Sequence, residues 1–477
     1  MTNRLLSMVL ALLALIANAE AAQETSGTGV AGRPSSGDVL QFTNVWTIHL
    51  RFTSEQWQAM EPKQSGGIQR GDRRASFLQG PEGGRNGIAS AFGFTFDYVH
   101  ADLEFGTNSF KNVGVRYKGN GTFLSSQNSL KRSLKIDLNQ FVKGQKVAGM
   151  SQLNLHNSVR DPSGMNEAVA YRLFREGGVP APRTAFAKVY VTVPGKHNRQ
   201  YFGLYNLVED VGSGFLEAHF SSKKGTLFKP VTPSLFSDQG DDWKAYNQTY
   251  DSKSDLTEEQ KRRVIEFCKL VSSAPDDEFN AKLGDFVEID NAARYLAITS
   301  WLTDLDGILG PGQNYYVYLH PKTQKFSFIP WDQDQPFGQF PRGTQEQREN
   351  LSIRQPWTGE NRFLKRLYGN EAFKAALLKH LHAFNTTLFE ARRIHAQVDE
   401  LAAALRAPIQ EESTARLSEF EKAAAGKELT VVMGPGFQGG TAVTPIKLFV
   451  ERRIKSVAAQ LEGKSEGATI TPGFGGR

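Results

Sequence analysis

The sequence NYYVYLHPKTQKFSFIPWDQD, residues 314–334, decides the fold of this chain. Two short apolar runs rich in aromatic residues flank a His-Pro-Lys-Thr turn, and this pattern predicts a β-hairpin. The two strands of a hairpin are antiparallel, so the start of the first lies beside the end of the second. We therefore expect Asn314 to lie close to Asp332. A loop just upstream carries Asp304 and Asp306, and it can reach the same place.

This end of the predicted hairpin gathers several oxygen ligands. Carboxylate and amide oxygens, with waters and substrate phosphates, are the groups that Mg²⁺ binds in proteins. Each residue also has an ordinary structural use, because Asp and Asn often close turns. The order Asp306, Asn314, hairpin, Asp332 is also the order in which a protein kinase presents its catalytic base and its two metal ligands. The sequence therefore favours a metal-dependent phosphoryl-transfer site.

Alternatives stay open within this segment. The gap between Asp306 and Asn314 is longer than in the ordinary kinase catalytic loop, so Asp304 is a second candidate for the base. Paired carboxylates can also hydrolyse glycosides, with Asp304 or Asp306 opposite Asp332. Hydrolysis would not explain the amide ligand or the lysines upstream. Trp331 either lines an adenine pocket or packs the hairpin.

The rest of the chain divides into a sheet-rich part and a helical part. Strands are predicted near residues 45–52, 101–105, 113–118, 134–138, 185–193 and 201–208, as an antiparallel sheet with glycine-rich turns. Residues 65–93 are expected to form a loop. Helices are predicted from Asp161 to Gly177, from about 256 onward, at 289–302, and from 362 onward. This order predicts an α+β fold of two lobes, a sheet-rich one at 45–230 and a mainly helical one at 231–462.

A phosphoryl-transfer site needs cations for the phosphates, and the sheet-rich part offers several. The stretch 114–122 has glycines that permit close backbone approach to an anion, and 131–136 is a lysine-bearing strand. Glu167 and Glu209 are carboxylates that can pair with such a lysine. Lys229, near the predicted junction of the lobes, is a further phosphate candidate. The residues alone do not choose among these.

The N-terminus predicts export. Arg4 precedes an apolar run and small residues at 19–22, which is typical of a secretory signal peptide over 1–21. Residues 22–44 are expected to be a flexible linker and 463–477 a flexible tail. The run is shorter than a bilayer span, so no stable membrane insertion is expected. A periplasmic, secreted or cell-envelope protein is therefore predicted.

Composition excludes several other classes. The formal net charge of +6 is mild for 477 residues, so no nucleic-acid binding is expected. The nine His are scattered and predict no zinc site, and no Walker P-loop is present. Cys268 is the sole cysteine, so no intrachain disulfide is possible. It lies on a predicted helix with a capping box at Thr257 and Gln260, and we expect an inert core thiol.

Five motifs together resemble the CotH kinase family, named for a spore-coat protein. They are residues 116–120, 131–136, 201–209, 314–318 and 329–334, and the resemblance extends from about 45 to about 461. It implies an atypical protein-kinase-like fold, ATP with Mg²⁺ or Mn²⁺, and transfer of phosphate to Ser or Thr of secreted or surface proteins.

Carried over position by position, the resemblance implies a role for each site residue. Asp306 is implied as the catalytic base and Lys135 as the phosphate-contacting lysine. Asp332 is implied as the principal metal ligand and Asn314 as its companion. The remaining candidates are Asp334 for the metal, and Gly119, Gly121, Glu209 and Trp331 for the nucleotide. The glycine loop, Gly119 to Phe123, lacks the serine pair expected at this point of the family, although Ser125 and Ser126 follow.

The leading functional prediction is a secreted, metal-dependent bacterial protein kinase that acts as a monomer. One alternative is a noncatalytic CotH-like module of the envelope or matrix. Another is a kinase for a small molecule or a glycan. Clustered carboxylates repel one another, and a scaffold gains nothing from them, so the sequence favours the enzyme.

Overall fold

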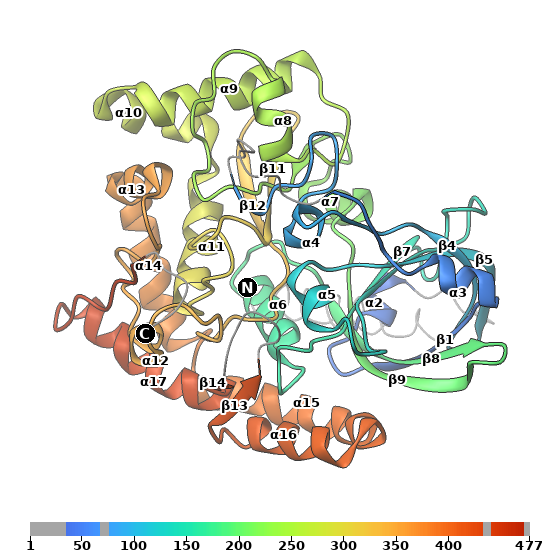
Figure 1. Ribbon diagram of the computed structural model, residues 1–477. Helices are drawn as coiled ribbons and strands as arrows, with labels where there is room; N and C mark the ends of the chain where they lie inside the picture. Colours follow the sequence, from blue (N-terminus) through green and yellow to red (C-terminus); the bar gives the residue numbers. More distant parts are fainter. Residues whose placement is uncertain (1–34, 67–75, 433–439, 472–477) are drawn as a thin grey trace, which may run out of the picture.

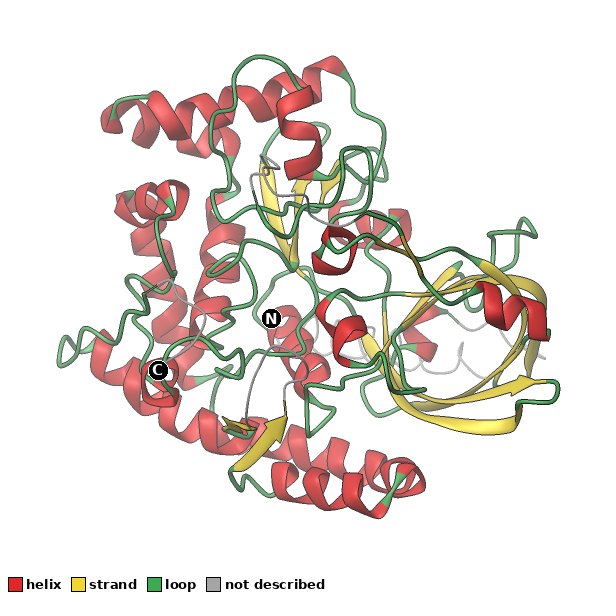
Figure 2. Cartoon of the chain, viewed as in Figure 1, coloured by secondary structure: helices red, strands yellow, loops and turns green. Residues whose placement is uncertain are grey.

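The computed structural model describes residues 35–66, 76–432 and 440–471 (Figure 1). They form a mixed α+β structure in which a seven-stranded sheet is followed by a mainly helical half, as the sequence predicts. The sheet curves into a barrel that lies to one side of the helices (Figure 2). The predicted signal peptide, residues 1–21, lies outside the described residues.

The barrel encloses one of the two hydrophobic cores of the described residues. Its strands, in spatial order, are β1 (Val45–Arg51), β4 (Val99–Phe105), β5 (Asn108–Tyr117), β6 (Leu134–Asp137), β7 (Gln152–His156), β9 (His197–Val208) and β8 (Thr184–Val193). Buried and more exposed residues alternate along β4 and much of β8, because successive side chains point to opposite faces of a strand. Ile48, Leu103 and Ile136 are fully buried and fill the interior.

The expectation of a purely antiparallel sheet was wrong in one respect. β1 pairs with β8 in parallel, from Val45 opposite Phe186 to Arg51 opposite Thr192, and with β4 in the antiparallel sense. This parallel pairing closes the barrel. Closure removes exposed sheet edges, which otherwise invite pairing with other chains.

Short elements decorate the barrel. They are α2 (Ser36–Val39), α3 (Ser54–Ala59), β2 (Lys63–Gln64), α4 (Ile88–Ala91), β3 (Phe94–Thr95) and α5 (Gly121–Ser125). The predicted linker thus contains a helix at its end, and this helix brings Val39 and Leu40 into the barrel core. The longer helix α6 (Asn166–Glu176) follows β7, and its buried residues belong to the core of the helical half. Helix α6 begins at Asn166 rather than Asp161, because the Asp161 carboxylate accepts bonds from the Ser163 and Asn166 amides and closes a turn.

The helical half surrounds a small second sheet of β10 (Thr226–Phe228), β11 (Tyr315–Leu319) and β12 (Phe326–Pro330). Its helices are α7 (Ser213–Phe220), α8 (Lys244–Tyr250), α9 (Glu258–Ser273), α10 (Asp276–Phe286), α11 (Ile289–Trp301), α12 (Gln345–Glu349), α13 (Arg362–Gly369), α14 (Glu371–Thr386), α15 (Ala391–Glu412), α16 (Thr414–Ala424) and α17 (Ile446–Leu461). A hairpin of β13 (Leu429–Val432) and β14 (Gly440–Val443) completes it. No helix within the described ranges has both the length and the apolarity to cross a membrane.

Two segments near the predicted boundaries have contacts of their own. β10, which precedes residue 230, pairs with β11 of the helical half. The start of the predicted tail is also packed: Ala468 bridges to Leu351, and Ile470 is buried. Residues 65–93, expected to be a loop, include α4 and bind the helical half through Gln79, which donates to the Val231 carbonyl at 3.0 Å.

A second set of contacts joins the barrel to helix α15 of the helical half. The Glu412 carboxylate, at the end of α15, accepts from Lys131 Nζ at 2.7 Å and from the Leu204 amide at 2.5 Å. The Tyr201 hydroxyl donates to the Pro408 carbonyl at 3.0 Å. Helix α15 therefore fixes the barrel to the helical half independently of the connection after β9.

Cys268 lies in the core of α9, as predicted. Its sulfur is 3.1 Å from the Tyr250 hydroxyl, and burial raises the pKa of the thiol to about 12. Only a thiolate attacks alkylating reagents, so we expect no labelling of the native protein by iodoacetamide at pH 8, and complete labelling in denaturant. Mass spectrometry of the two samples measures this directly. Native labelling as fast as denatured labelling would mean that α9 opens readily.

Candidate active site

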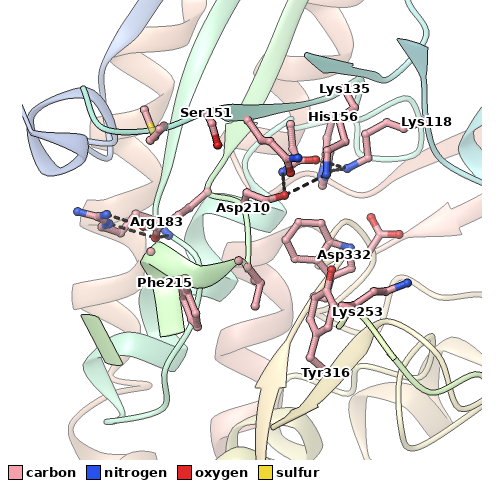
Figure 3. A pocket seen from close by; sticks show the side chains of 18 of the residues that line it. Lys118, Lys135, Ser151, His156, Arg183, Asp210, Phe215, Lys253, Tyr316 and Asp332 are labelled. Carbon is pink, nitrogen blue, oxygen red and sulfur yellow. Dashed lines mark hydrogen bonds and ion pairs between the residues drawn. The ribbon is translucent and has the colours of Figure 1, made fainter. Parts of the chain in front are cut away.

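A cavity of about 840 Å³ lies between the barrel and the helical half. Figure 3 shows its two walls, with Lys118, Lys135 and His156 on the barrel side and Asp332 and Tyr316 on the other. The lining is strongly basic. It includes Arg85, Arg116, Lys118, Lys135, Lys146, Arg183, Lys223, Lys229 and Lys253, against the acidic Glu209, Asp210, Asp332 and Asp334. Such a cavity fits an anionic ligand.

The predicted hairpin supplies one wall. β11 and β12 pair in register from Tyr315 opposite Pro330 to Leu319 opposite Phe326, and the Trp331 amide donates to the Asn314 carbonyl at 3.2 Å. Asn314 and Asp332 have φ values of 59° and 56°. Among non-glycine residues, Asn and Asp adopt this left-handed backbone most readily. The hairpin thus ends, on both strands, in residues suited to a sharp change of direction.

Two carboxylates face the cavity without a partner. Asp332 and Asp334 both line it, and neither side chain forms a hydrogen bond or ion pair with the described part of the chain. Burial raises the pKa of Asp334 well above its usual range, and the charge of Asp332 adds to this effect. Two unpaired carboxylates that repel each other in a buried place fit a divalent cation, which neutralises both and satisfies their oxygens.

Asp306 and Asn314 contact each other at the end of the hairpin. The Asp306 carboxylate accepts from Asn314 Nδ2 at 3.1 Å and from Gln313 Nε2 at 3.0 Å. Burial raises the pKa of Asp306 to about 7, a value suited to a group that takes up a proton near neutral pH. The Asn314 amide oxygen accepts no bond from any described residue and is available as a ligand.

Asp304, the alternative base, has a different partner. Its carboxylate accepts from Gln333 Nε2 at 2.9 Å, and burial raises its pKa to about 6. Asp304, Asp306 and Asn314 are all buried, and none of them is among the described residues that line the cavity. The charges of Asp332 and, to a smaller extent, Asp306 both raise the pKa of Asp334, so these three carboxyl groups lie near one another.

The nucleotide candidates are only partly gathered in one place. Lys135 lines the cavity, where its ammonium lies 3.2 Å from Asp210. Glu209 also lines it, but both of its oxygens bind the Arg183 guanidinium, so it is not a partner of Lys135. Trp331 forms part of the wall, with Lys118 Nζ 5.2 Å from the centre of its ring.

The predicted glycine loop is partly helical. Gly119 lines the cavity with φ of 92°, and a Cβ there would lie 2.4 Å from Thr122 Oγ1, so only glycine fits. Gly121 instead begins the short helix α5, where a Cβ would lie 2.8 Å from the Arg160 guanidinium. It does not line the cavity among the described residues.

Sequence reasoning missed several residues of this site and did not single out another. His156 and Asp210 line the cavity and were not predicted. Lys118 lay inside the stretch 114–122 but was not singled out. Its ammonium lies 2.5 Å from His156 Nε2 and 3.2 Å from Asn154 Oδ1, and burial lowers its pKa to about 7. The available signal was Lys118 directly before Gly119, at the end of a predicted strand.

Two comparisons with known proteins bear on this site. Residues 115–453, well over half of the chain, match the family model described as CotH kinase protein. The chain is also 25% identical over 265 residues to the inner spore coat protein H of Bacillus subtilis (strain 168), which covers 55% of this chain and 70% of that protein. Residues 115–453 contain all the residues weighed above as the base, the metal ligands or the nucleotide contacts.

Proposed function

Because this chain belongs to the CotH kinase family, we propose that it is an ATP- and divalent-metal-dependent kinase with a two-lobed, atypical protein-kinase-like fold. Family membership implies a kinase-like phosphotransferase that uses ATP. The metal, the acceptor and the role of each residue are the parts we add. The observation that carries them is the pair of unpartnered carboxylates, Asp332 and Asp334, which face a cavity whose charged lining residues are mostly cations.

In this proposal each group of residues has a separate role. Asp332 and Asp334, with the amide oxygen of Asn314, hold Mg²⁺ or Mn²⁺, which supplies neutralising charge to the phosphates. A lysine of the cavity binds the phosphate oxygens. The rings of Trp331 and Tyr316, 5.4 Å apart, offer an apolar wall for adenine. Asp306 orients the acceptor hydroxyl and takes its proton. Most of the catalysis is then positioning and charge neutralisation.

The proposed acceptor is a Ser or Thr of a secreted or envelope protein, phosphorylated outside the cytoplasm by a monomeric enzyme. The predicted signal peptide supports this location, and the name of the Bacillus relative, inner spore coat protein H, is that of a coat protein. A small molecule or a glycan is the alternative acceptor, and a noncatalytic envelope module is the alternative to an enzyme.

The test of the metal assignment is thermal melting of the purified protein with ATP, with Mg²⁺ or Mn²⁺, and with both. A ligand that binds the native state raises the midpoint by mass action, by about 3 °C for a chain of this size at one hundred times its Kd. We expect this increase only when ATP and metal are both present. Asp332→Asn should abolish it.

Asp277→Asn, at an exposed Asp in the first turn of α10, is the matched control and should behave like the wild type. A metal-dependent increase that survives in Asp332→Asn would overturn the metal assignment. No increase under any condition, with a normal melt, would favour the noncatalytic module instead.

A further inference from the structure

One position of the fold departs from the usual kinase arrangement. In protein kinases the lysine that contacts the phosphates lies on the third strand and pairs with a glutamate on the helix αC. Here the strand directly before α6 is β7, and α6 carries Glu167. The last residue of β7 is His156, which lines the cavity. An imidazole therefore occupies the place where a lysine is expected.

The lysine comes from another strand. Lys118 follows the end of β5, and its ammonium lies 2.5 Å from His156 Nε2. On the other side of the ring, His156 Nδ1 lies 2.9 Å from both oxygens of Glu167. The three side chains thus form a line from the cavity to the helix, with the imidazole between lysine and glutamate.

The donors and acceptors of this line are fixed by its chemistry. An ammonium group has three donors and no lone pair, so His156 Nε2 accepts the bond from Lys118. The ring proton is then on Nδ1, where it is donated to the Glu167 carboxylate. Burial, and the neighbouring charge of Lys118, hold the pKa of His156 well below its usual range, which agrees with a neutral ring.

Helix α6 also contacts Asp332, the proposed metal ligand. Tyr171 lies one turn after Glu167 on α6, and its hydroxyl accepts from the Asp332 amide at 2.9 Å. His156, Glu167 and Asp332 have ligand atoms within 4.8 Å of one another, a spacing that a metal ion could also use. Both ring nitrogens of His156 are already engaged, however, Nε2 by Lys118 and Nδ1 by Glu167.

We propose that Lys118, not Lys135, is the lysine that contacts the donor phosphates, and that His156, supported by Glu167, is the residue that positions it. This rests on the proposed kinase function and specifies its phosphate-binding machinery. Lys118 and Lys135 both line the cavity, but Lys135 is paired with the Asp210 carboxylate, whereas Lys118 is held by neutral groups, His156 and Asn154. No carboxylate of the described residues forms an ion pair with Lys118, so its amino group is left for an anionic ligand, whose charge favours the ammonium form.

The experiment compares Lys118→Met with Lys135→Met in the full chain. The affinity for ATP and for adenosine is measured in Mg²⁺, along with ATP turnover. We expect Lys118→Met to weaken ATP binding at least tenfold and to lower turnover about a hundredfold, while adenosine binding stays within twofold. Lys135→Met should change ATP binding less than threefold. A general structural loss would weaken adenosine as well, so adenosine separates the two causes.

The positioning role is tested at His156. His156→Leu removes both hydrogen bonds and should reproduce most of the loss of Lys118→Met, whereas His156→Gln retains an acceptor for the ammonium and should recover part of it. The double variant of Lys118→Met and His156→Leu should be no worse than Lys118→Met alone, because both changes remove one function.

The outcomes distinguish this inference from the function on which it rests. If the wild type neither binds ATP nor turns it over, the proposed kinase function fails first. If the wild type is active, and Lys135→Met is the inactive variant while Lys118→Met is not, the assignment of Lys118 is wrong. If Lys118→Met is inactive but His156→Leu equals the wild type, the positioning role of His156 is wrong.

Discussion

Asp306→Asn is expected to lower phosphoryl transfer by about 10²- to 10⁴-fold while leaving the affinity for Mg²⁺ and ATP within twofold. The substitution keeps the size of the side chain and one of its two acceptor oxygens, which can still accept from the amide of Gln313 or from that of Asn314. It removes the group that takes the acceptor proton. Asp306 does not line the cavity among the described residues, so nucleotide binding should be little changed.

The measurement is release and incorporation of label from ATP labelled at the γ-phosphate, beside the melting experiment for binding. Asp304→Asn is the matched control, because Asp304 is equally buried and also accepts from a glutamine amide. We expect Asp304→Asn to retain most of the activity. If Asp304→Asn is inactive and Asp306→Asn is active, the base is Asp304. If both variants bind nucleotide and transfer normally, neither carboxylate is the base.

The largest expected effect on stability comes from Arg453. Its side chain is fully buried in α17 and donates to the carbonyls of Ser300 at 2.9 Å, Trp301 at 3.1 Å and Leu351 at 2.7 Å. Burial lowers the pKa of Arg453 to about 9, so it remains charged at neutral pH. Ser300 and Trp301 end α11, where a cation is favourable and the last carbonyls lack partners within the helix.

We expect Arg453→Leu to lower the free energy of unfolding by about 3–5 kcal/mol, because it strands these carbonyls in the core. Chemical denaturation measures this change. Arg452→Leu, at the neighbouring position, is the matched control. Arg452 is 39% exposed and pairs with Glu349 and Glu428, so its loss should cost at most about 1 kcal/mol. Equal losses for the two variants would contradict the role assigned to Arg453.

Local patterns made much of this structure predictable. The hairpin at 314–334 and the capping box at Thr257 depend on residues close together in sequence, and both are confirmed. The contact between Asp306 and Asn314 is also local, because a short loop joins Asp306 to Asn314, the residue directly before β11. The predicted α+β order is confirmed for the same reason, since each strand and helix has its own local period.

The features that depend on contacts between distant parts of the sequence could not be predicted. The parallel contact of β1 with β8 joins residues far apart in sequence, and no local pattern specifies it. β7 was not predicted at all, because its sequence, Gln152 to His156, alternates polar and apolar residues over only five positions. His156 therefore had no assigned place, and its contacts with Lys118 and Glu167 arise only when β5, β7 and α6 pack together.

The boundary of the family match differs from the boundary of the closed barrel. The segment matched by the family model begins at Val115, in the second half of β5, whereas β1 and β4 lie before it. A chain cut at Val115 would keep the catalytic candidates, but it would lose most of β5 and would leave β8 without its neighbour β1. The segment that the family model matches is therefore shorter than the segment that forms the closed barrel. Shortened versions of this protein should begin before Val45, so that they keep β1.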